Sequence, residues 1–308
     1  MRDIKIIYEG TNIYPDISLN SCYHDMFSEK QGDELLIRFN DTRRLWDGWA
    51  PKKNDTISVE DNAASTGKMY IESVIPKNGL VTLRAISIPQ SYRNKTNKSW
   101  EKIRFLQLAG EIAGRHGLNL AQYGIDDQIY DYVAQNNIPD FAFLQQRCVL
   151  EGAAFLVYDG ALVVYSEQHL EGQPALDTIE VGPADDFEYT DDADNAYGTF
   201  EAVNGNLTGI YSANNDSDKV FRKIIPVRMS SQEEANRFAK GLLRNENKGM
   251  TSGAIWAPIA RSYSAGSIVN IKTQGSSSWD GPAFLTHVRH DYVREQSKIF
   301  FRRPLEGY

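Results

Sequence analysis

The chain has 308 residues, of which 41% are hydrophobic and 24% charged, as in a globular protein with room for two or three compact units. Its formal net charge of −8 argues against stable nucleic-acid binding, which needs a basic surface. No apolar run approaches the roughly 20 residues that cross a bilayer, so we expect no membrane segment. Met1–Lys5 lacks the apolar core of a signal peptide, which predicts assembly in the cytoplasm. The only cysteines, Cys22 and Cys148, are expected to be buried thiols.

Residues 1–90 carry the alternating apolar pattern of short β-strands. Turn-forming sequences separate these segments, for example Asn54-Asp55 and Asn78-Gly79. Many short strands with regular turns are typical of a small barrel or sandwich, so we predict a first β-barrel domain here. The predicted strands are residues 4–8, 17–21, 35–39, 56–59, 68–74 and 80–85.

A helix-helix-hairpin unit is predicted over residues 91–176, after a polar connector at residues 89–98. Apolar residues at three- and four-residue steps predict a helix from Ser99 to His116 and a second from Asp140 to Glu151. Asp159-Gly160, between two apolar runs, then predicts a tight β-hairpin.

The first of these helices has an apolar stripe that includes Leu106. We expect the stripe to pack against a neighbouring element, because its small residues allow close approach. Leu106→Asp would then bury an unpaired carboxylate and prevent folding or assembly. The stripe residues are Ile103, Leu106, Ala109, Gly110 and Ala113.

Residues 177–308 return to strand patterns, interrupted by one helix. Ser231-Gln232-Glu233-Glu234 matches a capping box, and an apolar stripe from Ala235 to Leu243 follows it. We predict a second β-barrel domain with one flanking helix. The predicted strands are residues 197–203, 207–211, 220–227, 268–271, 284–288 and 298–301.

A weak internal repeat relates the two strand-rich regions. Residues 67–74 and 80–85 follow a short strand, and residues 281–290 and 297–301 follow the strand at 268–271 in the same order. The lengths match although residue identity does not, so chance similarity between two β-rich regions remains an alternative. The predicted fold class is α+β, mainly β, with two similar small barrels on either side of the helix-helix-hairpin unit.

No motif for catalysis, a cofactor or a metal ion stands out. His287 and His290 lie three apart on a predicted strand, where side chains point to opposite faces, so we expect them to be structural rather than metal ligands. Nucleophile-elbow and nucleotide-binding glycine patterns are missing from the sequence. We therefore predict no catalytic residue, no cofactor and no metal, and a protein that is not an enzyme.

Two features suggest interaction surfaces. Leu45-Trp46-Asp47-Gly48-Trp49 places Trp46 and Trp49 in a predicted loop, where exposed indoles are typical interface anchors and buried ones close a core. A run of acidic residues between two predicted strands is either a solvated loop or a surface that lines a channel or faces a basic partner. This acidic run contains Asp185, Asp186, Glu188, Asp191, Asp192 and Asp194.

Taken in order, a set of short segments resembles the baseplate hub proteins of contractile phage tails and phage-tail-like bacteriocins, the late control protein D family, in particular its XkdQ-like branch. The likeness extends through the whole chain. None of the segments is a catalytic motif, so its specificity comes from their order. The segments are residues 6–10, 38–41, 98–101, 113–118, 140–144, 233–238, 289–292 and 300–305.

The resemblance implies a structural hub that forms a homotrimer. Each chain would contribute two barrels to a pseudo-sixfold ring, which adapts the hexameric tail tube to a trimeric spike. The implied partners are a tail tube or tube-initiator protein, a separate spike protein and surrounding baseplate proteins, in a phage or phage-tail-like particle. An acidic ring would repel DNA and let it pass without stable binding.

Two other functions stay open from the sequence. One is a cell-wall hydrolase, or a carrier for one, at the baseplate. The other is a carbohydrate- or receptor-binding β protein in which Trp46 and Trp49 form the stacking platform. The sequence does not distinguish a phage from a bacteriocin, identify the spike, or say which barrel faces the tube.

Overall fold

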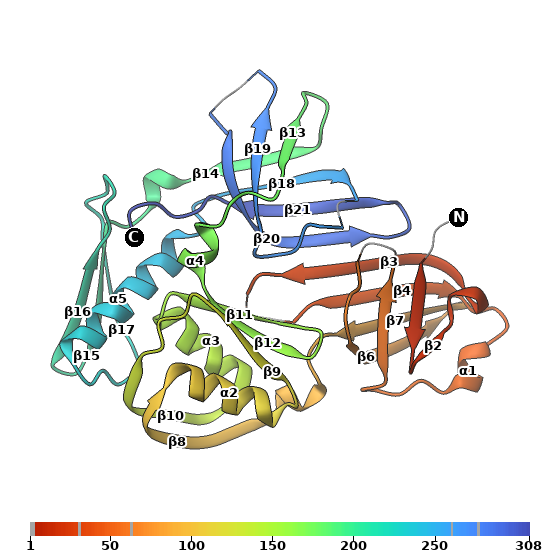
Figure 1. Ribbon diagram of the computed structural model, residues 1–308, viewed down its shortest axis with the longest axis horizontal. Helices are drawn as coiled ribbons and strands as arrows, with labels where there is room; N and C mark the ends of the chain where they lie inside the picture. Colours follow the sequence, from red (N-terminus) through yellow and green to blue (C-terminus); the bar gives the residue numbers. More distant parts are fainter. Residues whose placement is uncertain (1–3, 30–31, 62–63, 260, 276–277) are drawn as a thin grey trace.

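The computed structural model is mainly β with a smaller helical part, which confirms the predicted fold class (Figure 1). A 13-stranded sheet runs through the molecule, and three small sheets accompany it. Met1, Arg2 and Asp3, which precede the first predicted strand, lie outside the described residues. The structure describes residues 4–29, 32–61, 64–259, 261–275 and 278–308.

The first half of the large sheet is an antiparallel set in the order β3-β4-β7-β6-β5-β1-β2. Alternate residues of its strands, such as Ile37, Val59 and Leu83, point into one apolar core. All six strands predicted in this region are present. The elements are β1 (Lys5–Tyr8), β2 (Thr11–Asn12), β3 (Ser18–Phe27), β4 (Glu34–Asn40), the short helix α1 (Leu45–Trp49), β5 (Thr56–Glu60), β6 (Met69–Lys77) and β7 (Leu80–Ile86).

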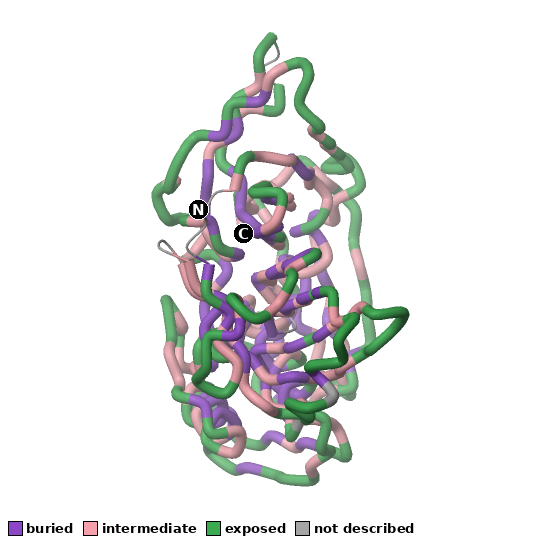
Figure 2. The backbone as a smooth tube through the Cα atoms, turned by 90° about the vertical axis from the view of Figure 1, so that its right-hand side faces the viewer, coloured by how far each residue is buried: buried purple, intermediate pink, exposed green. Residues whose placement is uncertain are grey.

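The second half follows the order β14-β18-β21-β20, with β19 and then β13 continuing from β20. It has its own core, which includes Ile255, Leu285 and Ile299. Figure 2 shows buried residues concentrated in the interior of the molecule and exposed residues on the outer loops. The strands are β13 (Thr178–Val181), β14 (Phe187–Asp191), β18 (Thr251–Pro258), β19 (Ile268–Thr273), β20 (Gly281–Asp291) and β21 (Gln296–Arg302).

The internal repeat extends to six strands in each half. In chain order, β1, β3, β4, β5, β6 and β7 correspond to β13, β14, β18, β19, β20 and β21, and the two sets have the same spatial order. The middle strands even share an irregularity, since β6 has a bulge between Ile71 and Ser73 and β20 has one between Leu285 and His287. The outermost pairs differ, because β5 pairs β1 antiparallel and β19 pairs β13 parallel.

Neither half is the closed barrel that the sequence predicted. Among the described residues, no hydrogen-bonded ladder joins the two ends of either half. The halves are instead continuous with each other, because β3 pairs with β20. A β-pattern with turns does not distinguish a closed barrel from an open sheet that wraps around a core, since both bury alternate residues.

The middle unit corrects one predicted helix. Residues 99–103 form a strand, and the helix begins only at Phe105. Lys102 has a left-handed backbone (φ 49°), which breaks the strand's alternation, so Trp100 and Ile103 are both buried at a spacing that looks helical. The second helix and the hairpin were predicted correctly. The elements are β8 (Lys95–Arg104), α2 (Phe105–Arg115), β9 (Asn119–Tyr123), β10 (Ile129–Pro139), α3 (Asp140–Leu150), β11 (Ala153–Tyr158), β12 (Ala161–Ser166) and α4 (Glu167–Glu171).

An insertion between β14 and β18 covers the middle unit. Its helix starts with the predicted capping box, in which Ser231 Oγ accepts a hydrogen bond from the Glu234 amide. The Glu234 carboxylate accepts one from the Ser230 amide. The apolar faces of the insertion join the core of the middle unit rather than that of the second half of the sheet. The insertion consists of β15 (Thr199–Asn204), β16 (Leu207–Ser212), β17 (Val220–Ile224) and α5 (Gln232–Asn247).

Helix α4 lies near the centre of the molecule (Figure 1), and buried ion pairs join it to the parts around it. Glu171 accepts hydrogen bonds from Arg244 of α5 at 2.7 Å and from Arg302 of β21 at 2.6 Å. Glu167 accepts one from Lys248 at 2.7 Å, and Lys248 also reaches Glu29 at the end of β3. The side chains of Glu171, Arg244 and Arg302 are each at most 5% exposed. We refer to this set as the α4 ion cluster.

We predict that Glu171→Gln lowers the free energy of unfolding by about 3–5 kcal/mol, because it leaves Arg244 and Arg302 buried without a counter-ion. Glu180→Gln is the matched control, since Glu180 pairs with Lys272 where both side chains are 66% exposed. The control should change stability by no more than about 0.5 kcal/mol. Urea unfolding curves of both variants measure the difference, and equal losses would contradict the role assigned to Glu171.

Candidate functional site

Among the described strands, the two halves of the sheet pair with each other at one joint, between β3 and β20. Asp25 of β3 accepts a hydrogen bond from Arg289 Nε at 2.7 Å and lies 2.6 Å from His287 Nε2. Burial raises the pKa of the Asp25 carboxyl, but its bonds to His287 and Arg289 outweigh burial and hold the pKa below its usual value. His24 and His290 lie directly opposite each other beside this pair, and both are buried.

The repeat predicts a second joint of the same kind, and its two strands are both open. β14 corresponds to β3, but it pairs only with β18 among the described strands. The part of β6 that corresponds to the β3-binding part of β20 is Ser73–Lys77, which pairs only with β7. Ile75 in this segment is 47% exposed. The second half of the sheet therefore has an open strand equivalent to β3, and the first half has an open strand segment equivalent to the β3-binding part of β20.

The acidic residues gather on and around β14, which corrects the expectation of a loop between strands. Glu188 and Asp191 belong to the strand itself. Asp191 accepts hydrogen bonds from the Ala193 amide and the Thr251 hydroxyl, and Asp185 accepts one from the Gly182 amide. All the members are exposed, and none forms an ion pair with a described residue. The acidic edge, as we call it, consists of Asp185, Asp186, Glu188, Asp191, Asp192 and Asp194.

Basic side chains gather near the open part of β6 and the turn that follows it. The Asp41 amide binds the Gly79 carbonyl at 2.7 Å, which holds the following residues beside the turn after β6. The Asn54 amide binds the Ile71 carbonyl at 2.9 Å, which places the preceding lysines beside β6. These side chains are exposed and, among the described residues, form no ion pair. The basic edge, as we call it, consists of Arg43, Arg44, Lys52, Lys53 and Lys77.

Trp46 and Trp49 lie on the short helix α1 rather than in a loop. Trp46 is only 3% exposed and packs on Phe39, whereas Trp49 is 37% exposed and contacts Trp46. The two indoles therefore do not form an exposed stacking platform. Trp49 and the neighbouring Leu45 are the apolar part of the surface beside the basic edge.

Leu106 is half-buried at the side of α2 rather than central to its apolar face. The buried face of the helix is centred on Leu108 and Ile112, one turn apart, and both are fully enclosed. The predicted apolar stripe does not coincide with the buried face of α2, because the stripe was counted from Ile103, which belongs to strand β8 and not to the helix. Leu106 lies at the edge of the core of the middle unit.

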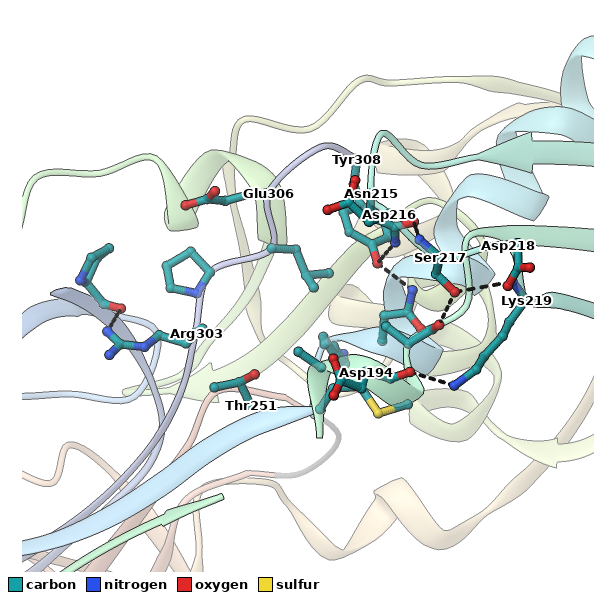
Figure 3. Close-up of a pocket in the computed structure, with 18 of the residues that line it drawn as sticks. Asp194, Asn215, Asp216, Ser217, Asp218, Lys219, Thr251, Arg303, Glu306 and Tyr308 are labelled. Carbon is teal, nitrogen blue, oxygen red and sulfur yellow. Dashed lines mark hydrogen bonds between the residues drawn. The ribbon is translucent and has the colours of Figure 1, made fainter. Parts of the chain in front are cut away.

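A cleft of about 700 Å³ lies between the C-terminal residues and the loop that follows β16 (Figure 3). Asp194 and Lys219 line one side, where Lys219 Nζ binds the Asp194 carbonyl at 2.5 Å, and Arg303 and Glu306 line the other. The charges are mixed and face an open space. Among the described residues, no three His, Cys, Asp or Glu side chains are grouped to hold a metal ion.

The remaining candidate residues have structural partners. His287 contacts Asp25, while His290 points to the other face and lies 2.8 Å from the Ser297 hydroxyl. Cys22 and Cys148 are buried free thiols, as expected from the sequence. In the described ranges of the chain, no helix is both long enough and apolar enough to span a membrane.

Solved structures share this fold along nearly the whole chain. The chain is similar to a tail protein from Neisseria meningitidis MC58 (TM-score 0.76, 12% identity, covering 97% of this chain and 96% of that one). It is also similar to the 43 kDa tail protein of prophage MuSo2 from Shewanella oneidensis (TM-score 0.77, 9% identity, 99% of each chain). A third similar structure is the E. coli c3393 protein, a component of the type VI secretion system (TM-score 0.62, 12% identity, 99% and 78%).

No protein-family model and no curated protein matches the chain. At such low identities, the structural likeness shows a shared fold. The fold is therefore that of phage tail proteins and of a secretion-system component related to them in structure.

The basic edge was not predicted from the sequence, although one signal was available. Lys77 ends a strand whose last three residues, Ile75, Pro76 and Lys77, are exposed, and the proline is typical of an edge strand. The α4 ion cluster was also missed, because charged residues such as Glu171 are expected at the surface unless their partners are known.

The pair of buried histidines at the β3–β20 joint predicts a pH-dependent stability. Burial, and then the nearby His24, lower the pKa of His290 from 6.5 to about 4. Arg261 also lowers it, while Asp61 acts in the opposite direction. The unfolded chain therefore takes up a proton that the folded chain does not, between about pH 6.5 and pH 4. The free energy of unfolding should fall by roughly 3 kcal/mol across this range.

Urea unfolding between pH 7.5 and pH 4 measures this effect. His290→Asn should flatten the pH dependence, because the titrating group is gone. His169→Asn is the control, since His169 is exposed on α4 and its removal should leave the slope unchanged. An unaltered slope in His290→Asn would show that other groups govern the acid response.

Proposed function

We propose that this protein is a structural hub of a phage tail or phage-tail-like particle, without enzymatic activity. In this role it forms a homotrimer whose six sheet halves make a pseudo-sixfold ring between the hexameric tail tube and the trimeric spike. The fold shared with tail proteins supports a tail component. The observation that carries the ring is the six-strand repeat, whose two halves leave complementary joint elements open.

The joint within the chain supplies a template for the joint between chains. Aligning the two bulges superimposes Ser73–Lys77 of β6 on His287–Asp291 of β20. The ladders through β4 and β7, and through β18 and β21, superimpose residues 188–192 on Tyr23–Phe27 of β3. If β14 of one copy adds to β6 of the next in the same register, each chain uses both of its open strands. Repetition of this contact by one rotation gives a closed ring rather than a dimer.

The register brings opposite charges together. Asp291 lies opposite Tyr23 in the chain's own joint, and the equivalent pair between copies is Lys77 opposite Glu188. Ile75, exposed in the single chain, would lie opposite Thr190 and be covered. The acidic edge of one copy would thereby face the basic edge of the next. Such pairing favours correct encounter and disfavours association between identical edges.

The first sheet half, the second sheet half and the middle unit each have a separate core, and we assign each a separate role. Residues 1–90 and most of residues 177–308 form the ring halves, and residues 91–176 form an outer unit, to which the insertion of β15, β16, β17 and α5 adds. The proposed partners are the tail tube or a tube-initiator protein, a separate spike protein and the surrounding baseplate proteins. The acidic balance of three chains, 3 × −8 = −24, supports passage of DNA without stable binding. A bacteriocin particle fits the same geometry as a phage.

Charge exchange at the proposed joint tests the ring. We predict that the wild-type protein sediments as a trimer at high concentration, whereas Lys77→Glu and Glu188→Lys each shift it towards monomer. Each single variant places like charges opposite each other at all three interfaces, and such pairs are destabilising on a sheet. The double variant, Lys77→Glu with Glu188→Lys, restores an opposite pair and should recover the trimer. Sedimentation velocity measures the populations.

Lys272→Glu is the control, because Lys272 pairs with Glu180 within one copy and lies outside the proposed joint. It should leave the trimer intact. A wild-type protein that stays monomeric inside purified particles would refute the ring. Trimers that survive both single reversals, or that the double variant does not recover, would refute the β14–β6 joint.

A further inference from the structure

A pocket of about 390 Å³ is lined by residues of α5, the start of β11 and the end of β12. These elements lie away from the open strands β14 and β6 (Figure 1). Three cationic side chains of α5 line it, at Arg237, Lys240 and Arg244. Spacings of three and four residues place them on one face of the helix. The opposite wall includes Gly152 and Ser166. The pocket thus has a basic wall, and its lining also includes the carboxylates of Glu151 and Asp126.

Two of the three cations retain unused hydrogen-bond donors. Arg244 is 2% exposed and gives Nη2 to Glu171, but its Nε and Nη1 have no hydrogen-bond partner among the described residues. Lys240 forms no ion pair or hydrogen bond with a described residue, and its ammonium lies 5.6 Å from the ring centre of Tyr211. Buried charged donors without partners are rare, because leaving them unsatisfied is costly.

The carboxylates at the pocket do not fill this need. Glu151 is held by Arg237 Nε at 2.7 Å and by the Tyr130 hydroxyl at 2.8 Å. Asp126 lies exposed at the opening and binds Gln128. Burial, and then the charge of Arg244, lower the pKa of Lys240, because the ammonium is partly removed from water and lies near a second cation. An added negative charge would offset this repulsion.

We propose that this pocket binds a small oxyanion, the carboxylate of an acidic side chain presented by a partner protein or a free phosphate. Lys240 Nζ is the charged donor, and the Arg244 guanidinium, which lines the pocket with buried and unpartnered N–H groups, adds a second positive charge. The Ser166 hydroxyl, which accepts a hydrogen bond from the His169 amide, keeps its own proton to donate. Charge-assisted bonds of this kind are the strong ones in protein recognition. The pocket would anchor one acidic group on the outer unit, independently of ring formation.

Isothermal titration of the full chain with inorganic phosphate and, separately, with acetate tests the proposal at fixed ionic strength. We expect saturable binding at one site per chain. Lys240→Met keeps an unbranched aliphatic side chain but removes the ammonium, so it should weaken binding about tenfold or more, whereas Lys240→Arg should retain binding. Lys223→Met is the control, since this half-exposed lysine belongs to the same insertion and lies outside the pocket.

The two probes separate the sources of the oxyanion. Binding of phosphate alone identifies a free anion site, and binding of acetate at comparable strength identifies a site for a protein carboxylate. A circular dichroism spectrum of Lys240→Met shows whether the variant is folded. The proposal is overturned if neither probe saturates, if folded Lys240→Met binds as tightly as wild type, or if Lys223→Met loses binding equally.

Discussion

The α4 ion cluster is the constraint on which the remaining structure depends. A five-residue helix would not persist alone, because a single turn does not repay its nucleation. Glu171 and Glu167 hold it from two sides, binding α5, β21 and, through Lys248, the end of β3. Since these elements belong to the insertion and to both sheet halves, one buried ionic group fixes three parts in one arrangement. Buried ion pairs contribute little net stability, so geometry is what they specify here.

The β3–β20 joint is the second constraint, and it explains how a duplicated unit can act asymmetrically. Both halves have the same strand order, yet only one of the two possible joints is made within the chain. Asp25 of β3 accepts a hydrogen bond from Arg289 of β20 and contacts His287 of the same strand, so a charged interaction links the two strands of this joint. The open equivalents at β14 and β6 have no such residues. They have opposite net charges instead, which suits a contact made after folding.

The mainly β class, the second helix, the hairpin and the capping box could be predicted because each depends on local chemistry. A period of 2 or 3.6, a tight Asp159-Gly160 turn and a Ser231 cap are all visible in adjacent residues. The start of α2 failed for a local reason too, because left-handed Lys102 disguises a strand as a helix. The destination of the insertion and the α4 ion cluster depend on residues over 70 positions apart, for which a single sequence gives no pattern.

Among the candidate surfaces, too, those formed by residues adjacent in sequence could be predicted, and those assembled from distant segments could not. An acidic run is visible in sequence, whereas the basic edge is assembled from two loops and a strand end, and Trp46 could be distinguished from Trp49 only by its packing on Phe39. The assembled edges also resolve a physical problem. Open strands invite indiscriminate pairing, and natural proteins guard them with charges and proline. Pro76 removes one donor from β6, and Glu188 and its neighbours repel a second β14. The like charges on β14 disfavour pairing of one β14 strand with another. The basic edge beside β6 has the opposite charge, so pairing of β14 with β6 of another copy is favoured over aggregation.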